Sequence, residues 1–527
     1  MTLVPVSRID ADVAVVGSGF AGSLAALALL RRGRRVVLVE RGRHPRFAIG
    51  ESSTPLANLL IEELSDRYDL PRVRAFSKWG TWQRAHPTVA CGLKRGFTFF
   101  FHQPGAAFVD DVDRGRQLLV AASPHDEVAD THWYRPHFDR ALAEEAQAEG
   151  AIYLDMTRID HLRHEGDSLT LEGERNGQSV RISARFVIDA SGPRGFLHRA
   201  LRLAESSPRW LPPTQGLYTH FAGVERWDRL RSTAEMPPYP VDDAAVHHVF
   251  PGGWIWMLRF NNGLTSAGAA LTDPLAVELG AADPAAAWRR LLETLPSVAD
   301  QFRSARAVLP FVHAPRVAFR SARVAGPAWA LLPSAAGVID PLLSTGFPLT
   351  LLGILRLVDL LERTSPGPDR DAALLEYEQA TLAELDATER LVSALYATMN
   401  DPPLFKRLSL MYFAAASFSE AARRLGRPEL APGFLLCDHP TFGPELSACA
   451  ALAASAPHGP ARLALEARID RAIEPFDTAG LLDRDRRDWY PFAAADLLAS
   501  SAKLRASPGE IVRLLERNGL MTQEGQS

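Results

Sequence analysis

The chain has 527 residues, of which 47% are hydrophobic and 23% are charged, a balance typical of a folded globular protein with a large core. Lys and Arg together number 58 and Asp and Glu together number 62, so the net charge is −4. The composition excludes a disordered, collagen-like or disulfide-stapled chain. Because a nearly neutral chain offers no bulk attraction to polyanions, we expect no nucleic acid and no membrane among its partners.

The three cysteines, Cys91, Cys437 and Cys449, do not stand in metal-ligand spacing, so we predict neither a metal site nor a disulfide framework. The first ten residues carry no basic segment followed by an apolar one, which predicts no secretory signal and a cytoplasmic protein. Lysine is scarce, with four residues in all, and arginine supplies the other basic side chains.

The first elements form a strand–helix–strand unit. An apolar run at 12–17 predicts a buried strand, the Ala- and Leu-rich segment 20–32 a helix, and 34–40 a second strand. Such a unit indicates a parallel sheet. Further helices are predicted at 56–68 and 135–149, and further strands at 93–101, part of 107–121, 151–155, 169–174, 179–183 and 185–190.

The second half of the sequence predicts antiparallel strands and helices in place of the strand–helix–strand pattern. Alternating residues and turn signals over 215–271 predict an antiparallel sheet, and 282–306 is predicted to be helical. A short buried strand is expected at 329–332 and a long helix at 346–363. From about residue 370 the pattern is mostly helical.

These elements predict a discontinuous α/β organisation. One nucleotide-binding domain is assembled from 10–105, 135–200 and 325–363. A β-rich, substrate-binding insertion comprises 106–134 and 201–324, and residues 364–527 form a helical C-terminal region.

The strongest local motif is a glycine-rich turn between the first strand and the first helix. Gly17, Gly19 and Gly22 permit a tight turn and a close approach of the backbone to a pyrophosphate, and the helix N-terminus favours its negative charge. Glu40, at the end of the next strand, could accept hydrogen bonds from a ribose. The motif therefore predicts dinucleotide binding, with NAD and FAD both open; a tight turn without a ligand is the alternative.

Three segments decide between the two nucleotides by resemblance. PRFAIGESSTP at 45–55, GWIWML at 253–258 and AGVIDPLLSTG at 336–346 resemble, in order and spacing, the corresponding segments of flavin-dependent halogenases among the FAD-dependent oxidoreductases. The resemblance covers Val13 to about residue 360. It implies a Rossmann-like FAD-binding domain with an inserted antiparallel β-sheet substrate region and a helical C-terminal region.

The resemblance also implies a set of site residues. Ser344, Thr345 and Gly346, which precede a helix, are expected to bind a halide, chloride or bromide, although simple capping of that helix is the alternative. The implied FAD contacts are Gly17, Gly19, Ala21, Gly22, Glu40, Arg41, Gly50, Glu51, Ser52, Arg135, Asp189, Asp340, Thr345 and Gly346.

Lys94 lies where halogenases carry their catalytic lysine. In such enzymes reduced FAD, O2 and halide give hypohalous acid, and a lysine can bind that oxidant by a hydrogen bond or as a haloamine beside an electron-rich carbon. Trp254 and Trp256 alternate with Ile255 and are expected on one face of a strand, walling the flavin from the substrate. The alternatives are a surface lysine in an ion pair and two core aromatic residues.

Leu343 stands where tryptophan halogenases usually carry glutamate, so the resemblance favours a phenol- or pyrrole-like substrate. Pro333–Ser334 replaces the Gly-Asp pair of many FAD enzymes and could weaken FAD binding. No second nucleotide motif is visible, so a separate flavin reductase is the expected partner, with a free or carrier-tethered substrate. An FAD monooxygenase or dehydrogenase that uses no halide, and a non-catalytic flavin-binding protein, remain the alternatives.

Overall fold

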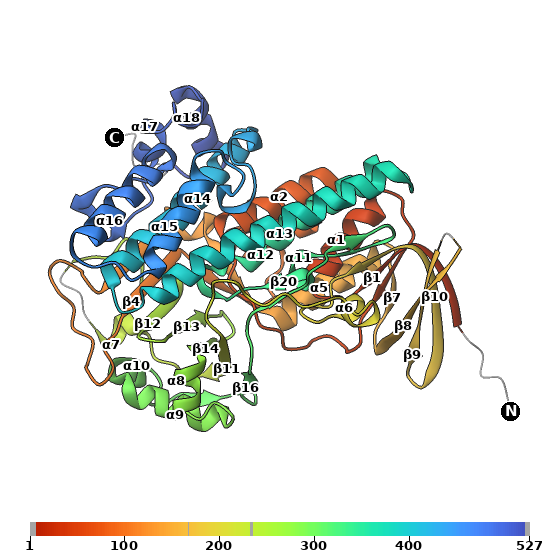
Figure 1. The fold of residues 1–527 in the computed structure, drawn as a ribbon, viewed down its shortest axis with the longest axis horizontal. Coiled ribbons are helices and arrows are strands. Elements are labelled where there is room, and N and C mark those ends of the chain that lie inside the picture. The colour runs from red at the N-terminus through yellow and green to blue at the C-terminus, as the bar shows by residue number, and fades with distance from the viewer. Residues whose placement is uncertain (1–6, 167, 232–234, 522–527) are drawn as a thin grey trace.

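The computed structural model describes residues 7–166, 168–231 and 235–521, which build two large sheets and two two-stranded ones, joined and covered by helices (Figure 1). The first sheet has eight strands in the order β18-β19-β10-β1-β2-β7, with β9 and β8 continuing beside β10. Its strands are β1 Ser7–Val16, β2 Val36–Val39, β7 Ile152–Leu154, β8 Thr157–Glu165, β9 Ser168–Arg175, β10 Gln178–Asp189, β18 Ala325–Gly326 and β19 Trp329–Leu331.

The centre of this sheet is parallel. β1 pairs in parallel with β10 and β2, and β10 and β2 pair in parallel with β19 and β7. Parallel strands need crossover connections, and the helices that make them bury the apolar strands on both faces. The helices packed here include α1 Phe20–Arg31, α2 Pro55–Tyr68, α5 Arg135–Ala148 and α12 Gly346–Arg363, with the shorter α3 Pro71–Arg74, α4 Trp79–Ala85 and α6 Phe196–Ala200 nearby.

The second sheet has nine strands in the order β15-β11-β14-β13-β12-β4-β5-β21, with β16 beside β11. Most pairs are antiparallel, as the alternation over 215–271 predicts; β12–β4 and β21–β5 are parallel. Its strands are β4 Gly96–Phe101, β5 Gln117–Ala121, β11 Thr214–Ala222, β12 Ala245–Phe250, β13 Gly253–Arg259, β14 Leu264–Thr272, β15 Arg306–Ala307, β16 Val312–Ala314 and β21 Trp489–Tyr490.

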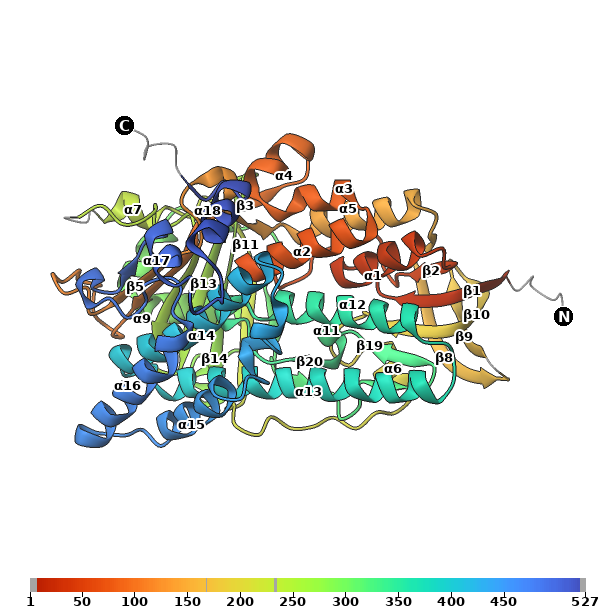
Figure 2. The same ribbon diagram turned by 90° about the horizontal axis from the view of Figure 1, so that it is seen from above.

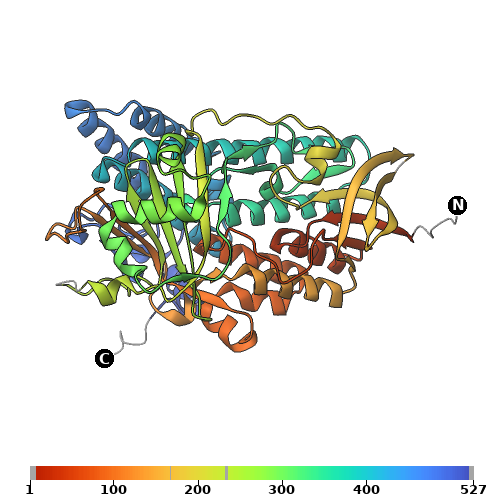
Figure 3. The same ribbon diagram turned by 90° about the horizontal axis from the view of Figure 1, so that it is seen from below.

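Both faces of the second sheet are buried, as the alternating side chains of β13 illustrate. Trp254, Trp256 and Leu258 join the main core, whereas Ile255 and Met257 join a second core on the opposite face. That second core is completed by α7 Trp227–Leu230, α8 Asp273–Glu278, α9 Pro284–Thr294 and α10 Pro296–Gln301. Figure 3 shows these green helices across the outer face of the sheet. The two indoles therefore share the inner face, as strand alternation predicts.

The C-terminal region is mostly helical, as predicted. α12 and α13 pack side by side along the molecule, spanning from one sheet to the other (Figure 2). One strand, β21, breaks the helical pattern and adds an edge to the second sheet. The helices are α13 Pro368–Ala397, α14 Pro402–Arg424, α15 Phe442–Ala454, α16 Gly459–Ile473, α17 Ala494–Ala499 and α18 Pro508–Arg517.

The segment predicted as one strand at 93–101 is two strands. β3 Cys91–Lys94 pairs with β6 Asp130–Trp133, and after Arg95 the chain enters β4 of the second sheet. Glycines permit the crossing, because a Cβ on Gly92 would lie 1.9 Å from the Arg259 carbonyl oxygen and one on Gly96 would lie 2.2 Å from that of Val120. Residues 96–101 thus lie in the second sheet, although the predicted boundary grouped them with the first; the division into domains stays a prediction.

One segment among the described residues is long and apolar enough to cross a bilayer by length and composition. It runs from Leu342 to Arg363 and consists of a short turn and α12. In its apolar 18-residue window, 78% of the residues are buried inside the protein. Its apolarity is that of a core helix packed against α1, α2 and α13.

Candidate active site

A cavity of about 660 Å³ lies between the two sheets, within the roughly 300–1,000 Å³ range of small-molecule and cofactor pockets. One end is walled by the glycine-rich turn and the loop after β10. The other end reaches the inner face of the second sheet, at Tyr218, His247, Trp254 and Trp256. Of the residues expected at the site, the wall includes Gly19, Ala21, Arg41, Gly50, Glu51, Ser52, Arg135, Trp254, Trp256, Asp340, Ser344, Thr345 and Gly346.

Residues of the glycine-rich turn have two different roles: some permit close backbone packing, and others line the cavity. Gly17 has φ +102°, and a Cβ there would lie 2.6 Å from the carbonyl oxygen of Ala190. A Cβ on Gly22 would lie 1.8 Å from the Gly17 carbonyl oxygen. Gly17 and Gly22 therefore permit close backbone packing, while Gly19 and Ala21 form part of the wall. The N-terminus of α1 has no side-chain cap and no acidic residue in its first turn, so it suits a phosphate.

Two acidic residues expected among the FAD contacts lie behind the cavity wall. Glu40 accepts hydrogen bonds from the Ser18 backbone (3.1 Å), the Gly42 backbone (3.0 Å) and Arg46 (3.1 Å). Burial acts to raise the pKa of Glu40, but Arg46 and the backbone donors outweigh it and lower the pKa. Asp189 accepts from the backbone N–H groups of Ser191 and Leu197. It thereby shapes the loop 190–194, which does line the cavity.

Arg135, at the start of α5, holds the loop that carries Gly50. Its guanidinium forms a bidentate pair with Asp139, at 2.6 and 2.8 Å. Its remaining nitrogen, Nη1, donates to the carbonyl oxygens of Ile49 (3.1 Å) and Gly50 (2.9 Å). Because Asp139 is fully buried and fixes the guanidinium, Arg135 presents a rigid cationic surface to the cavity.

Glu51 connects this loop to the second sheet, and Ser52 connects it to β3. Oε1 of Glu51 lies 2.9 Å from Nε2 of His220 on β11, and its other oxygen has no hydrogen-bond partner within the described chain. The hydroxyl oxygen of Ser52 accepts a hydrogen bond from Nζ of Lys94 at 3.0 Å. Ser52 thus lies between the lysine and the cavity.

Lys94 ends β3 and is completely buried. Besides Ser52, its Nζ donates to the carbonyl oxygen of Ser53 at 2.5 Å and lies 3.7 Å from the centre of the Phe97 ring. Burial holds the pKa of Lys94 well below its usual range, and the negative charge of Asp130 opposes that shift. Lys94 itself is not part of the cavity wall; Ser52 and His247 provide the wall beside it.

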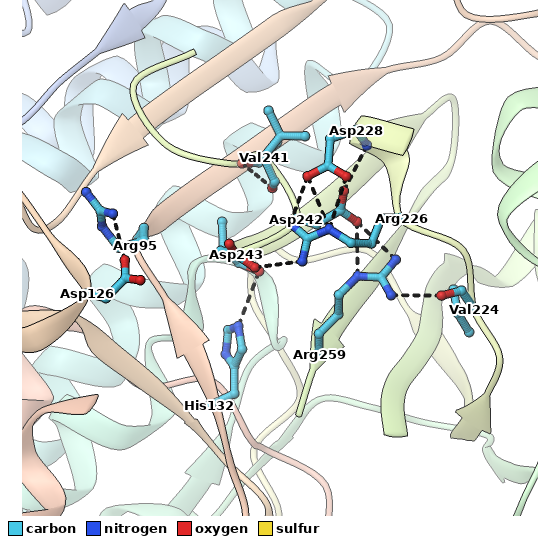
Figure 4. A network of polar contacts seen from close by, with 12 residues as sticks. Arg95, Asp126, His132, Val224, Arg226, Asp228, Val241, Asp242, Asp243 and Arg259 are labelled. Carbon is cyan, nitrogen blue, oxygen red and sulfur yellow. Dashed lines mark hydrogen bonds and ion pairs between the residues drawn. The ribbon is translucent and has the colours of Figure 1, made fainter. Parts of the chain in front are cut away.

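The end of β3 is fixed by a charged network outside the cavity (Figure 4). The backbone N–H of Arg95 donates to the carbonyl oxygen of Asp243 at 2.6 Å. Arg226 pairs with the Asp243 side chain at 2.9 Å, and Arg259 pairs with Asp242 at 3.0 Å. These charges balance one another and position the backbone beside Lys94.

Trp254 is held by a buried cluster at the inner end of the cavity. Its indole N–H lies 3.3 Å from Oδ1 of Asp340 and 3.2 Å from the hydroxyl of Tyr396, and that hydroxyl donates to Oδ2 of Asp340 at 2.9 Å. Burial raises the pKa of Asp340 to about 6, although donors from the Leu342 backbone, Tyr396 and Trp254 oppose the rise. His247 stacks on Trp254 at 5.2 Å between ring centres. Sequence reasoning missed Tyr396, His247 and Asp130.

Trp256 lies next to Trp254, with 5.6 Å between ring centres, and its N–H donates to Ser266 at 3.3 Å. A glycine makes room for it, because a Cβ on Gly268 would lie 2.3 Å from Cζ2 of Trp256 and 2.4 Å from Cβ of Tyr218. The two indoles form a continuous aromatic surface at the cavity wall.

The turn after Asp340 brings a second helix N-terminus to the cavity. Leu343 and Ser344 adopt left-handed backbone angles, with φ of 64° and 57°. The turn places Thr345 and Gly346 at the start of α12, which has no side-chain cap, and a Cβ on Gly346 would meet no atom within 4 Å. An uncapped helix N-terminus suits an anion. Pro333 and Ser334 also line the cavity.

These features fit FAD. Two uncapped helix N-termini, an arginine held by a buried aspartate and the glycine-lined turn face one cavity, which continues to an aromatic wall. The described parts of the chain hold no group of three or more His, Cys, Asp or Glu side chains placed to bind a metal ion.

Comparison with known proteins gives the same result. Residues 12–330 match the family model of FAD dependent oxidoreductases. The chain is 29% identical to tetracycline 7-halogenase of Kitasatospora aureofaciens, over 77% of this chain and 73% of that protein. It is 30% identical to monodechloroaminopyrrolnitrin halogenase PrnC of Pseudomonas fluorescens, over 74% of this chain and 68% of that protein.

Among solved structures, the crystal structure of halogenase PltM in complex with phloroglucinol and FAD has a TM-score of 0.82 and 26% identity. The match covers 90% of this chain and 99% of PltM, so it includes the C-terminal helical region as well as both sheets. The chain is an FAD-dependent oxidoreductase that belongs to the flavin-dependent halogenase family.

Proposed function

We propose that this protein is a two-component halogenase that uses reduced FAD, O2 and a halide, chloride or bromide, to halogenate an electron-rich, phenol- or pyrrole-like ring. The observation that carries the proposal is the buried side-chain amine of Lys94, hydrogen-bonded to Ser52 on the wall of the cavity. This lysine is shielded from bulk water and lies one hydrogen bond from a cavity that suits FAD, which is where the proposed chemistry requires it.

The cofactor would be held by the residues that face the cavity. Gly19 and Ala21 at the start of α1 would face its diphosphate, and Arg135 and Gly50 would line the same cavity beside it. When bound and reduced, FAD supplies the two electrons that activate O2 and so oxidise the halide to hypohalous acid. Gly17, Gly22, Glu40 and Asp189 would act indirectly, by shaping the turns that carry the contacts.

The halide would bind at the N-terminus of α12. Ser344, Thr345 and Gly346 all line the cavity, and no side chain caps the helix. The partial positive charge of a helix N-terminus attracts an anion and falls off within the first turn, so a halide there would be held close to the cofactor.

Lys94 would control the halogen-transfer step. Its ammonium group donates a hydrogen bond to the oxygen of hypohalous acid, which makes the halogen more electrophilic. As the ring attacks the halogen, the oxygen–halogen bond breaks and the oxygen takes a proton from Lys94 to leave as water. The ring then loses its proton, which restores the ammonium group, so atoms and charge balance.

Trp254 and Trp256 would form a wall that keeps the oxidant from meeting the substrate too early. Both indoles are almost fully buried and both line the cavity. Asp340 and Tyr396 fix Trp254, and Ser266 fixes Trp256, so the aromatic wall is rigid rather than loosely packed.

The substrate class rests on Leu343 and on the relatives. Leu343 places an apolar, fully buried side chain where tryptophan halogenases usually carry glutamate. The relatives act on tetracycline or bind phloroglucinol, according to their names. We propose a phenolic or pyrrolic substrate, either free or tethered to a carrier protein, and a separate flavin reductase as the electron donor.

The proposal is tested by mass spectrometry of products from wild-type protein, reductase, FAD, O2 and bromide with a panel of phenols and pyrroles, free and carrier-bound. We expect the bromine isotope doublet with wild type and a loss of at least ~100-fold with Lys94→Met, since general-acid groups contribute about 10²–10⁴-fold. Lys503→Met, which removes a lysine bonded only to carbonyl oxygens in the C-terminal region, is the matched control. Hydroxylated product without bromide would favour the monooxygenase alternative, and unchanged bromination by Lys94→Met would refute the role of Lys94.

A further inference from the structure

Lys94 faces an acidic residue across a strand pair. β3 and β6 are antiparallel, and their register sets Lys94 directly opposite Asp130. Side chains directly opposite in an antiparallel pair extend from the same face, with Cβ atoms about 4.5–5.5 Å apart. Both residues are buried, with relative exposures of 0% for Lys94 and 6% for Asp130. The protein therefore encloses one cation and one anion together.

A hydrogen-bond chain joins the two groups through residues of neighbouring segments. Nδ2 of Asn58 on α2 donates to Oδ1 of Asp130 at 2.7 Å, and the hydroxyl of Ser53 donates to Oδ1 of Asn58 at 3.0 Å. The carbonyl oxygen of Ser53 accepts from Lys94. Oδ2 of Asp130 has no hydrogen-bond partner within the described residues. Asn58 therefore fixes one oxygen of the Asp130 carboxylate, and no hydrogen bond within the described residues neutralises the other.

The other titratable groups around Lys94 and Asp130 are either neutral or paired with a group of opposite charge. His132 on β6 and His247 on β12 are buried, and burial together with the charge of Lys94 lowers the pKa of each, so both imidazoles are neutral. Tyr412 on α14 lies near Asp130, and burial, with Asp130 adding to it, raises the pKa of its hydroxyl above the usual range.

The charges on α14 and α2 near Asp130 pair with each other. Arg424 forms ion pairs with Glu420 at 2.8 Å and with Glu62 at 3.1 Å, and Lys78 lies 3.7 Å from Glu62. Asp130 is left as the acidic group whose charge acts on Lys94.

We propose that Asp130 is a positioning residue that holds the Lys94 amine in its protonated form and in place beside Ser52. The inference rests on the proposed function for its catalytic meaning, but the charge coupling itself requires no cofactor. In a site without bulk water, an ammonium group alone would lose its proton, because burial penalises the charged form. A carboxylate across the strand pair offsets part of that penalty. Removing the carboxylate would leave an uncompensated buried charge.

The pairing determines which chemistry Lys94 performs. An ammonium group donates a hydrogen bond to the oxidant and then a proton to its departing oxygen, whereas a neutral amine would be a nucleophile that traps the halogen. Asp130 favours the first role. Burial raises the pKa of Asp130 and Lys94 opposes that rise, so each residue favours the ionised form of the other.

The chain offers a direct test because it contains four lysines. In the full-length, cofactor-free protein labelled with [ε-¹³C]lysine, Lys94 gives one of four NMR signals, assigned by its absence in Lys94→Met, and its titration reports its own pKa. We expect Asp130→Asn to lower the midpoint of that titration by at least one pH unit, and Asp130→Glu to keep it near the wild-type position. Asp130→Ser, which also removes the charge, serves if Asp130→Asn does not fold.

Asp477→Asn is the matched control, because Asp477 is another buried carboxylate but caps a turn in the C-terminal region. It should leave the Lys94 midpoint unchanged. Equal midpoints in wild type and both charge-removing variants would overturn the inference. The NMR result does not depend on halogenation, so a failure of the proposed function and a failure of the coupling are distinguishable. In the active enzyme, Asp130→Asn should shift the alkaline limb of the rate–pH profile in the same direction as the NMR midpoint.

Discussion

The hydroxyl oxygen of Ser52 accepts a hydrogen bond from Nζ of Lys94 at 3.0 Å, and Ser52 belongs to the cavity wall while Lys94 lies behind it. This contact joins the loop expected to hold the flavin to the strand that carries the lysine. An oxidant formed in the cavity would therefore meet Lys94 at Ser52.

Ser52→Ala tests that contact. Losing one hydrogen bond to a charged group costs roughly 1.5–3 kcal/mol, so we expect bromination to fall about 10- to 100-fold while reduced FAD still consumes O2. The ratio of brominated product to O2 consumed is the measurement. Ser65→Ala is a suitable control, because the Ser65 hydroxyl is buried without a hydrogen-bond partner in the described chain. A ratio equal to that of wild type would exclude Ser52 as the link.

Gly268→Ala tests the aromatic wall. The added Cβ would lie 2.3 Å from Trp256 and 2.4 Å from Tyr218, so the indole must shift. Overpacking of this kind costs about 1–3 kcal/mol of stability. We expect hypohalous acid to escape, measured as halogenation of an external scavenger. Gly509→Ala on α18, whose added Cβ would lie 3.6 Å from Nη1 of Arg513, should cause no escape. A folded Gly268→Ala protein that retains the oxidant would contradict the barrier role.

The Asp340 carboxyl predicts a specific pH dependence of stability. Its folded-state pKa, about 6, is above its ordinary value of 3.8, so the folded protein binds its proton more tightly than the unfolded chain. The resulting stabilisation is complete below pH 4 and is lost as pH rises through about 6, with an amplitude on the order of 2–3 kcal/mol. Asp340→Asn removes this dependence.

Urea unfolding of the cofactor-free protein between pH 4 and 7 checks the effect. The free energy of unfolding of Asp340→Asn minus that of wild type should increase with pH across this window, whatever constant offset the lost hydrogen bonds introduce. A difference that stays flat would place the pKa of Asp340 near its ordinary value.

Lys94 predicts an alkaline limit to activity. Burial holds its pKa well below the ordinary value near 10.4, so the ammonium form is lost as pH rises through that lowered pKa. We expect the rate of halogen transfer, measured in single turnovers with saturating substrate, to fall in the same pH range. A rate that is constant up to pH 10 would show that proton donation from Lys94 does not limit the step.

The sequence predicts some parts of this account and not others. The glycine-rich turn and the strand that follows are local, so Gly19 and the parallel sheet could be predicted from short segments. The shared face of Trp254 and Trp256 follows from strand alternation. The catalytic role of Lys94 is predicted only through the resemblance to halogenases. Its burial could not be predicted, because β3 and β4 separate at Arg95 into different sheets.

The missed residues act through long-range pairing. Asp130 faces Lys94 only because β3 pairs with β6 in one register, and Tyr396 reaches Trp254 across 142 residues of chain. His247 lies in a strand whose pattern does not distinguish a stacked cavity residue from a core histidine. The positions of Glu40 and Asp189 behind the wall likewise depend on loop packing rather than on local sequence.

The most direct measurement of the central claim is a crystal structure of the protein with FAD and bromide, with bromide located by anomalous scattering. The account predicts FAD in the cavity between Gly19 and Gly346, bromide at the N-terminus of α12, and an open passage from there to Ser52 and the Lys94 amine. FAD bound elsewhere, or a continuous layer of protein between the flavin and Ser52, would contradict it.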